Sequence, residues 1–109
     1  MTIEYSQLAQ ARENSTNAVS IYSTSVGETV QVFLKISNST TSTVKARVFH
    51  DNDGTTYDET TQIAWDVDIM AGSFLEIDKV FMNNENGNLA YRSSVANALN
   101  ATVYGIIKS

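Results

Sequence analysis

Apolar and polar residues alternate most clearly over residues 61–69, and the rest of the chain is expected to pack around the apolar face of this stretch. Every second position from Ile63 is apolar, whereas the positions between them include two aspartates. A period of two is typical of an antiparallel strand that buries one of its faces. A tight connection at 70–73 then leads to a second strand over 74–81. The buried face of the first strand is predicted to hold Ile63, Trp65, Val67 and Ile69.

The same alternation recurs along the rest of the chain. In the strand expected at 28–38, Val32 and Leu34 point inward, while Phe33 interrupts the outward polar positions; in the strand at 43–50, Val48 points inward. Four further strands are expected, at 2–12, 19–22, 89–95 and 98–108, with polar loops between them. About eight strands at roughly ten-residue intervals predict an all-β fold, a single antiparallel β-sandwich of the jelly-roll kind.

Composition agrees with an all-β fold and limits its size. A chain of 109 residues suffices for one domain with one core. Ser and Thr occur 12 times each and Asn 10 times, which suits strands and short turns. Proline is absent, so turn geometry depends on Gly, Asn and Asp. We therefore expect one domain over 1–109, with residues 1–12 either its first strand or an extended N-terminal arm.

Charge and composition argue against several classes of partner. The net charge is −5 and the seven basic residues are scattered along the sequence, whereas nucleic acids and anionic membranes call for clustered Lys and Arg. The chain has no apolar run of membrane-spanning length, and its start lacks the pattern of a secretory signal. The absence of cysteine excludes disulfides and thiolate metal sites. We expect no nucleic-acid partner and no membrane association.

Residues 51–54, which read DNDG, are similar to half of a calcium-binding loop. The complete loop also needs an acid two positions earlier and a bidentate Glu at its end, where this chain has Phe49 and Thr60. Asp and Asn side chains commonly bond their own backbone in turns. The sequence therefore predicts an Asx-type turn and no metal site.

No set of catalytic residues emerges from the sequence. His50 is the only histidine and has no cysteine partner or fixed nucleophile, so we expect an ordinary position at a strand end. Four acids, Asp66, Asp68, Glu76 and Asp78, could meet across a central hairpin expected around 70–73, as paired carboxylates do in glycosidases. Their outward positions on amphipathic strands favour solvated charges instead. We expect no enzyme activity and no cofactor.

Several short motifs resemble a family of small virion proteins of tailed phages, especially marine and cyanobacterial ones. Residues 5–10 read YSQLAQ, which is similar to the Y-x-x-L-G-Q start common in that family, although Ala9 replaces the usual Gly. The other similar segments are IYST at 21–24, LKISN at 34–38, the IAWD and IMAG pair within 63–72, and the closing strand at 100–107. The order of these elements is kept over nearly the whole chain, but the family's proline after Tyr-Thr is missing.

This resemblance implies a function in the virion, after assembly in the cytoplasm of the bacterial host. It implies a capsid decoration (cement) protein that oligomerises, by analogy as a trimer, and binds the major capsid protein or another virion protein. One alternative is a tail or fibre component such as an adaptor or knob. Another is a carbohydrate-binding sandwich module, which the predicted inward position of Trp65 disfavours.

Assembly on a particle requires exposed contacts. We expect the segment 2–12 to extend a neighbouring sheet by strand addition, with a first strand in its own sandwich as the alternative. Outward aromatic residues are the other expected contacts, with core or loop packing as the alternative. The predicted contact residues are Ile3, Tyr5, Leu8, Phe33, Phe49, Tyr57 and Tyr91.

Overall fold

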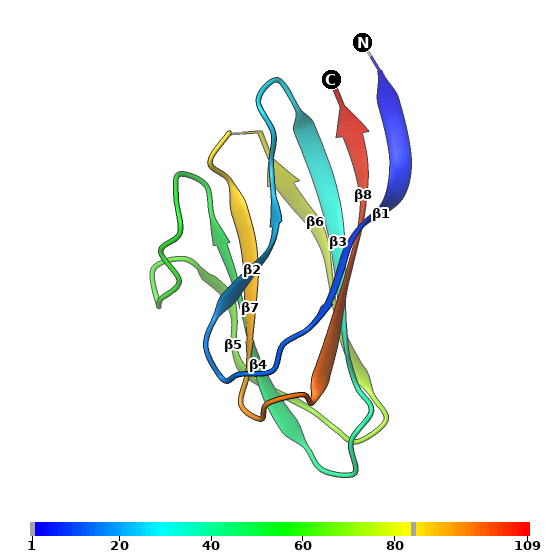
Figure 1. The fold of residues 1–109 in the computed structure, drawn as a ribbon, viewed down its shortest axis with the longest axis vertical. Coiled ribbons are helices and arrows are strands. Elements are labelled where there is room, and N and C mark those ends of the chain that lie inside the picture. Colours follow the sequence, from blue (N-terminus) through cyan, green and yellow to red (C-terminus); the bar gives the residue numbers. More distant parts are fainter. Residues whose placement is uncertain (1, 84) are drawn as a thin grey trace.

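The computed structural model describes residues 2–83 and 85–109, which form two four-stranded antiparallel sheets packed face to face (Figure 1). Sheet A has the order β1-β8-β3-β6 and sheet B the order β2-β7-β4-β5. The strands are β1 (Ile3–Arg12), β2 (Val19–Ser23), β3 (Thr29–Asn38), β4 (Val44–Asp51), β5 (Gln62–Ile69), β6 (Phe74–Met82), β7 (Asn88–Ser93) and β8 (Leu99–Lys108). These two orders are those of a jelly roll, so the predicted all-β jelly-roll sandwich is confirmed.

The N-terminal segment does not leave the sandwich as an arm. Residues 3–12 form β1, which pairs antiparallel with β8 as an edge strand of sheet A. Next to this pair, Thr2 and Ser109 exchange two backbone hydrogen bonds of 2.8 and 2.9 Å, so the two ends of the chain lie side by side (Figure 1).

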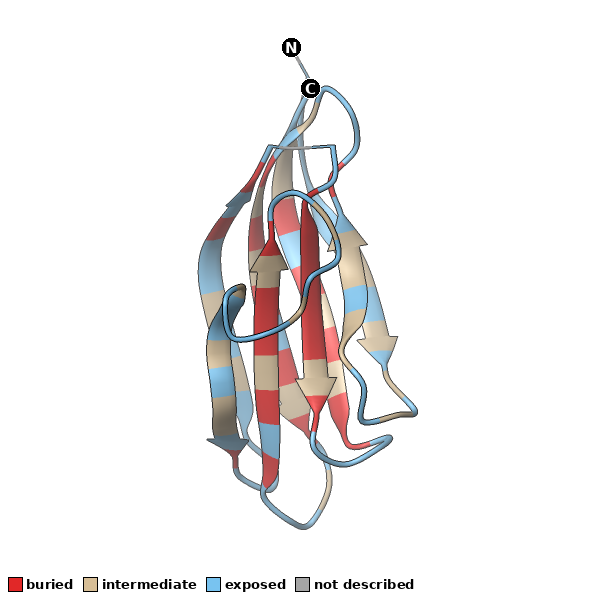
Figure 2. Ribbon diagram, turned by 90° about the vertical axis from the view of Figure 1, so that its left-hand side faces the viewer, coloured by how far each residue is buried: buried red, intermediate tan, exposed pale blue. Residues whose placement is uncertain are grey.

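The core lies between the sheets and is built by the inward-facing residues of both. Val32 and Leu34 of sheet A and Val48 and Ile69 of sheet B are buried, as their alternation predicts, and Val67 is half-buried. In Figure 2 the two central strands of sheet B, β4 and β7, carry most of its buried positions, while the flanking strands are more open.

The prediction that Ile63 and Trp65 belong to the core is wrong. Ile63 is 44% exposed and Trp65 is 37% exposed. The cause is a β-bulge in β5: Ala46 pairs with Val67 but Val48 pairs with Ala64, so Trp65 and Asp66 together stand opposite one residue of β4. An extra residue reverses the alternation, and a second register shift follows at once around Ile63.

Every edge strand carries such a register shift, and the two central pairs carry none. The shifts lie at Gln7–Ala9 in β1, at Ser20–Tyr22 in β2, in β5, and in β6 opposite Val32–Leu34. The pairs β3–β8 and β4–β7 are regular. Bulges twist an edge and interrupt its free hydrogen-bonding groups, which discourages pairing with a strand of another chain.

The bulge in β1 depends on a glycine in β8. A Cβ atom at Gly105 would lie 2.5 Å from Leu8 Cδ1 and 2.9 Å from the backbone oxygen of Gln31. Only glycine therefore allows the side chain of Leu8 to pack over β8 toward the core at this point.

Two buried asparagines fasten the ends of the sandwich. At one end, Asn38 donates two 2.8 Å hydrogen bonds, to the carbonyl oxygens of Ser42 and Ile69. At the other end, Asn88 accepts from Ser20 and donates to the Gly54 carbonyl. Each side chain thereby joins segments that are distant in sequence.

Candidate functional site

The acidic loop after β4 is organised by its own backbone. The Asp51 carboxylate accepts hydrogen bonds from the amides of Thr56 at 2.6 Å and Asp53 at 3.2 Å, and these donors lower its pKa. The predicted Asx-type turn is thus confirmed. Across residues 2–83 and 85–109, no group of three or more acids or histidines is placed to hold a metal ion, and no helix could span a membrane.

The other residues weighed for catalysis are separated by the fold. His50 lies near the end of β4, as predicted, where burial lowers its pKa. The prediction of a central hairpin around 70–73 is wrong, because β5 and β6 belong to different sheets. Asp66 and Asp68 therefore do not face the acids of β6. Instead, Asp66 pairs with Arg47, and Asp68 with Lys45.

The outer face of sheet A carries an uncovered group of large apolar side chains. In one row across the sheet, Tyr5 of β1, Ile106 of β8, Gln31 of β3 and Phe81 of β6 are register partners. In the next row Tyr104 of β8 pairs with Phe33 of β3. We call Tyr5, Phe33, Phe81, Tyr104 and Ile106 the apolar band. Tyr5, Phe81 and Tyr104 are 76%, 62% and 48% exposed, and the other two are half-buried.

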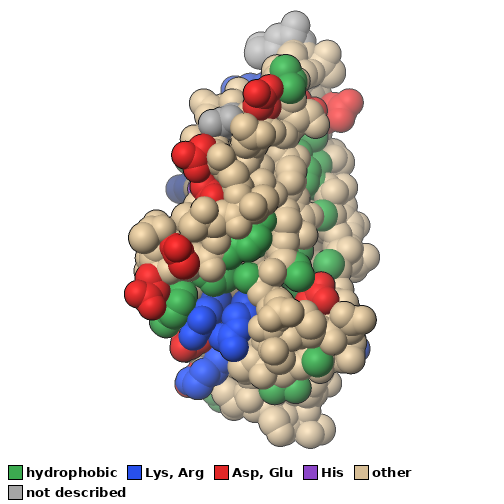
Figure 3. Space-filling model, turned by 60° about the vertical axis from the view of Figure 1, so that its left-hand side comes forward, with side chains coloured by type: hydrophobic (Ala, Val, Ile, Leu, Met, Phe, Trp, Pro, Cys, Tyr) green, Lys and Arg blue, Asp and Glu red, His purple; other side chains and the backbone are tan. Residues whose placement is uncertain are grey.

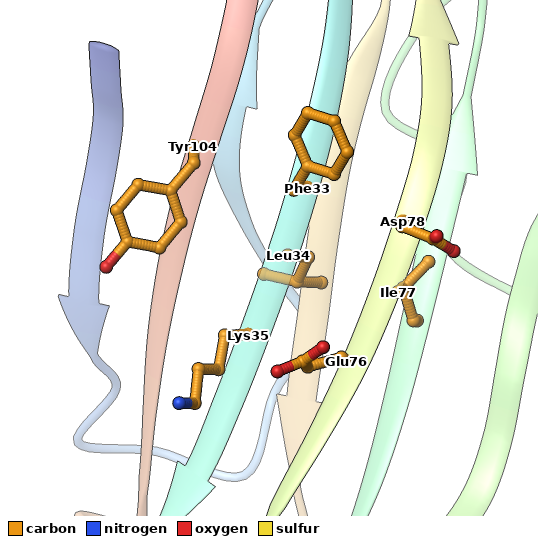
Figure 4. Close-up of a pocket in the computed structure, with 7 residues that line it drawn as sticks. All are labelled: Phe33, Leu34, Lys35, Glu76, Ile77, Asp78 and Tyr104. Carbon is orange, nitrogen blue, oxygen red and sulfur yellow. The ribbon is translucent and has the colours of Figure 1, made fainter.

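Two hollows adjoin the apolar band within sheet A, and a third, of about 370 Å³, lies between Phe81 and the residues His50 and Ile63 of sheet B. The first, of about 180 Å³, lies across β8, β3 and β6 and combines apolar walls with charged side chains (Figure 4). Its lining residues are Phe33, Leu34, Lys35, Glu76, Ile77, Asp78 and Tyr104. The second, of about 200 Å³, includes Phe81, Ile106 and Lys108. The surface between the two hollows is therefore apolar, and charges lie at its borders.

The outer face of sheet B has a different chemistry, centred on the β5 bulge. The guanidinium of Arg47 lies 3.7 Å from the centre of the Trp65 ring and donates two hydrogen bonds to Asp66, at 2.7 and 3.1 Å. Arg92, the β7 register partner of Arg47, lies 4.0 Å from the same carboxylate. We call Arg47, Trp65, Asp66 and Arg92 the Trp65 cluster. Figure 3 shows Lys and Arg side chains gathered on this face beside a hydrophobic surface.

The ion pairs of the Trp65 cluster shift the pKa values of the paired groups. The pKa of Asp66 is lowered, first by the hydrogen bond from Arg47 and then by the positive charges of Arg47, Arg92 and Lys45. The hydrogen bond to Asp66 in turn raises the pKa of Arg47, and the charge of Glu59 adds to this effect. Basic residues that are scattered in the sequence thus meet on one face.

Two predicted assembly contacts are wrong, because Phe49 and Tyr91 are buried. Phe49 lies under the loop 52–61, with its ring centre 6.0 Å from that of Tyr57 and 6.2 Å from that of Trp65. Tyr91 faces the core from β7, and its hydroxyl accepts from the Glu13 amide at 3.0 Å and donates to the Ala11 carbonyl at 3.4 Å.

The remaining predicted contacts differ in their surroundings. Ile3 and Tyr5 are exposed, Phe33 lies in the apolar band, and Leu8 is half-buried against the core. Tyr57 is half-buried against Phe49. Their role in assembly stays a prediction.

Sequence reasoning missed several residues of both faces. Phe81, Tyr104 and Ile106 occupy outward positions that strict alternation could have revealed, since each neighbours a buried residue on its strand. For Arg47 and Arg92 there was no such signal, because their meeting depends on the pairing of β4 with β7 and on the β5 bulge.

No protein-family model matches this chain, and no curated protein matches it either. The candidate surfaces therefore have to be interpreted from their own chemistry.

Proposed function

We propose that this protein is a structural component of a phage particle, a capsid decoration (cement) protein that binds its neighbours through the apolar band. The observation that carries the proposal is the uncovered row of large apolar side chains on the outer face of sheet A. The phage context comes from the sequence motifs alone. The role as an assembly protein is supported by the surface.

Burial of the apolar band would release a favourable free energy. Apolar surface removed from water contributes about 25 cal/mol per Å², and contiguous exposed apolar patches typically mark interaction sites. Because Tyr5, Tyr104 and Phe81 project from three strands of one sheet, a flat partner surface could cover all three side chains together.

The edges of the sandwich suit this arrangement. All four edge strands are bulged, which discourages the strand addition expected for residues 2–12. Association through a sheet face needs no free edge. The proposed partners are a second copy of the chain, in a trimer according to the resemblance, and the major capsid protein or another virion protein.

The test compares the oligomeric state and particle binding of matched variants. Phe81→Ser combined with Tyr104→Ser should abolish self-association in sedimentation velocity runs and reduce the copy number in purified particles. Met70→Ser is the control, because Met70 is 65% exposed but lies in the β5–β6 connection, outside the apolar band. If the double variant associates as the parent chain does, the apolar band is not the assembly surface.

A tail or fibre component is the alternative within the particle. The two locations differ in stoichiometry, since a shell protein is present at a far higher copy number than a tail protein. Quantitative gel densitometry of purified particles separates them.

The exposure of Trp65 favours a second candidate function, which is glycan binding. A buried Trp65 would have excluded the indole as a platform for sugar rings. Its position on the outer face of sheet B, beside ionic side chains, removes that objection. Aromatic rings combined with a few polar groups are typical of small-molecule sites.

A further inference from the structure

Two guanidinium groups share one carboxylate in the Trp65 cluster. Asp66 is already bound by both hydrogen bonds from Arg47, and Arg92 approaches it only to 4.0 Å. One positive charge is therefore left over in this trio, on a chain whose net charge is −5. The charge of Glu59, in the loop between β4 and β5, raises the pKa of Arg47, but among the described residues Glu59 forms no ion pair with either arginine.

Arg92 is the group that can accept an anionic ligand. Its Nε donates a 2.9 Å hydrogen bond to the Thr16 carbonyl, which fixes the plane of the guanidinium. Within the described part of the chain, its terminal amino groups donate no hydrogen bond, although a guanidinium offers five donors. A carboxylate is the natural bidentate partner for such a fork.

Trp65 is a partly exposed aromatic side chain next to this charge. Arg47 lies over its ring and Phe49 meets it at an interplanar angle of 88°, and 37% of the residue is still exposed. β5 and β7 are separated only by β4, so Trp65 and Arg92 project from strands about 10 Å apart.

The backbone of β5 is distorted to create this arrangement. Asp66 has a φ of 52°, which is uncommon for a residue with a side chain. The distortion brings two consecutive side chains opposite Arg47 on the same face, where a regular strand would place them on opposite faces. Bulges that redirect side chains are frequent beside binding sites.

We propose that the Trp65 cluster binds an oligosaccharide that carries a carboxylate, such as a uronic-acid glycan. One sugar ring packs against the part of Trp65 that Arg47 and Phe49 leave exposed, and the carboxylate of a neighbouring unit pairs with Arg92. This site deepens the glycan-binding candidate and is independent of assembly through the apolar band, which lies on the other sheet.

The single tryptophan gives a direct readout of the site. The probe is trigalacturonate, titrated into the full chain while Trp65 fluorescence and the heat of binding are recorded at low and high salt. The comparison ligand is its methyl ester, which has the same rings without the negative charges. We expect saturable fluorescence and heat signals for the acid, weakened by salt, and at least about tenfold weaker binding of the ester.

Two variants assign the roles of the residues. Arg92→Gln should weaken binding of the acid by about tenfold and leave the ester unchanged. Trp65→Ala, followed by calorimetry, should weaken both. The matched control is Lys35→Gln, which removes one positive charge from the outer face of sheet A and should leave binding unchanged.

The outcomes separate the proposal from the broader candidate. Equal binding of the acid and the ester, abolished by Trp65→Ala, would retain glycan binding and overturn the role of Arg92. Binding that survives Trp65→Ala would overturn the site itself. The absence of heat and fluorescence change at millimolar trigalacturonate would overturn both, without affecting assembly through the apolar band.

Discussion

Both sheets contain a bulged edge strand, but the residue opposite the bulge differs between the two outer faces. In each sheet an edge strand is bulged at a residue with positive φ, Asp66 in β5 and Lys79 in β6. In sheet B the residue opposite the bulge is Arg47, which binds both bulged side chains. In sheet A it is Phe33, which lies in an apolar surface.

The bulges therefore determine where side chains project from each sheet, whereas the residue opposite each bulge determines the chemistry of the surface. The face with Phe33 can act by removing apolar area from water, which favours a broad protein partner. The face with Arg47 holds ionic groups in fixed positions, which favours recognition of a small polar ligand. The following predictions test whether the two faces are as different as they appear in the structure.

The largest effect is expected for Phe49, beneath the outer face of sheet B. Phe49→Ala should reduce the free energy of unfolding by about 3–5 kcal/mol, because it removes a buried ring. Phe81→Ala, in the apolar band, should change it by less than about 0.5 kcal/mol. Urea denaturation under monomeric conditions measures both; equal losses would mean that Phe81 is buried in the free protein.

A smaller loss is expected at the glycine that allows β1 to bulge. Gly105→Ala should destabilise the fold by about 1–3 kcal/mol, since the new methyl group would meet the backbone oxygen of Gln31. Gly54→Ala is the matched control, because its nearest contact would be an ordinary 3.6 Å. Similar thermal midpoints for the two variants would contradict the close packing of β1 on β8.

Trp65 should contribute less to stability than its size suggests. Trp65→Ala should cost about 1 kcal/mol, mainly through the lost contact with Phe49. Indole emission from the parent chain should indicate partial solvent exposure. A loss comparable to that of Phe49→Ala would return Trp65 to the core and remove the proposed glycan platform.

The smallest effect is a pH dependence confined to the face with ion pairs. Because the folded pKa of Asp66 lies below its usual 3.8, its pairing stabilises the fold above that pH and is lost as the pH falls through the folded pKa. Asp66→Asn should therefore lower stability at pH 6 and bring the variant closer to the parent at pH 3. An unchanged difference between the two chains at both pH values would show that the charge of Asp66 is not what stabilises the cluster.

The strands and most of the core could be predicted because alternation is a local property. Val32, Leu34 and Val48 lie in regular stretches, and their inward positions follow from the period of two. Trp65 was misplaced because one extra residue reverses the pattern. Asp tolerates a positive φ better than most residues, but an outward Asp is also ordinary on an amphipathic strand, and Lys79 gives no such signal.

The residues of the candidate sites were harder to predict from the sequence than the fold. Arg47 and Arg92 are 45 positions apart and meet only because β4 lies beside β7 in sheet B. Tyr91 was predicted to be available for contacts, but it faces the core between the two sheets, where residues 11–13 bind its hydroxyl. Such facts depend on strand order, which period-two patterns do not encode.

The position of β8 between β1 and β3 has a consequence for how the chain folds. Among the strands of the described residues, only β4 and β5 are both consecutive in sequence and paired, so almost every ladder forms only when distant segments meet. Folding dominated by such distant pairings takes milliseconds to seconds in comparable β-sandwiches. On the ribosome, β1 and β3 would lack their shared neighbour until residues 99–108 had emerged, so sheet A cannot close before that segment has been synthesised.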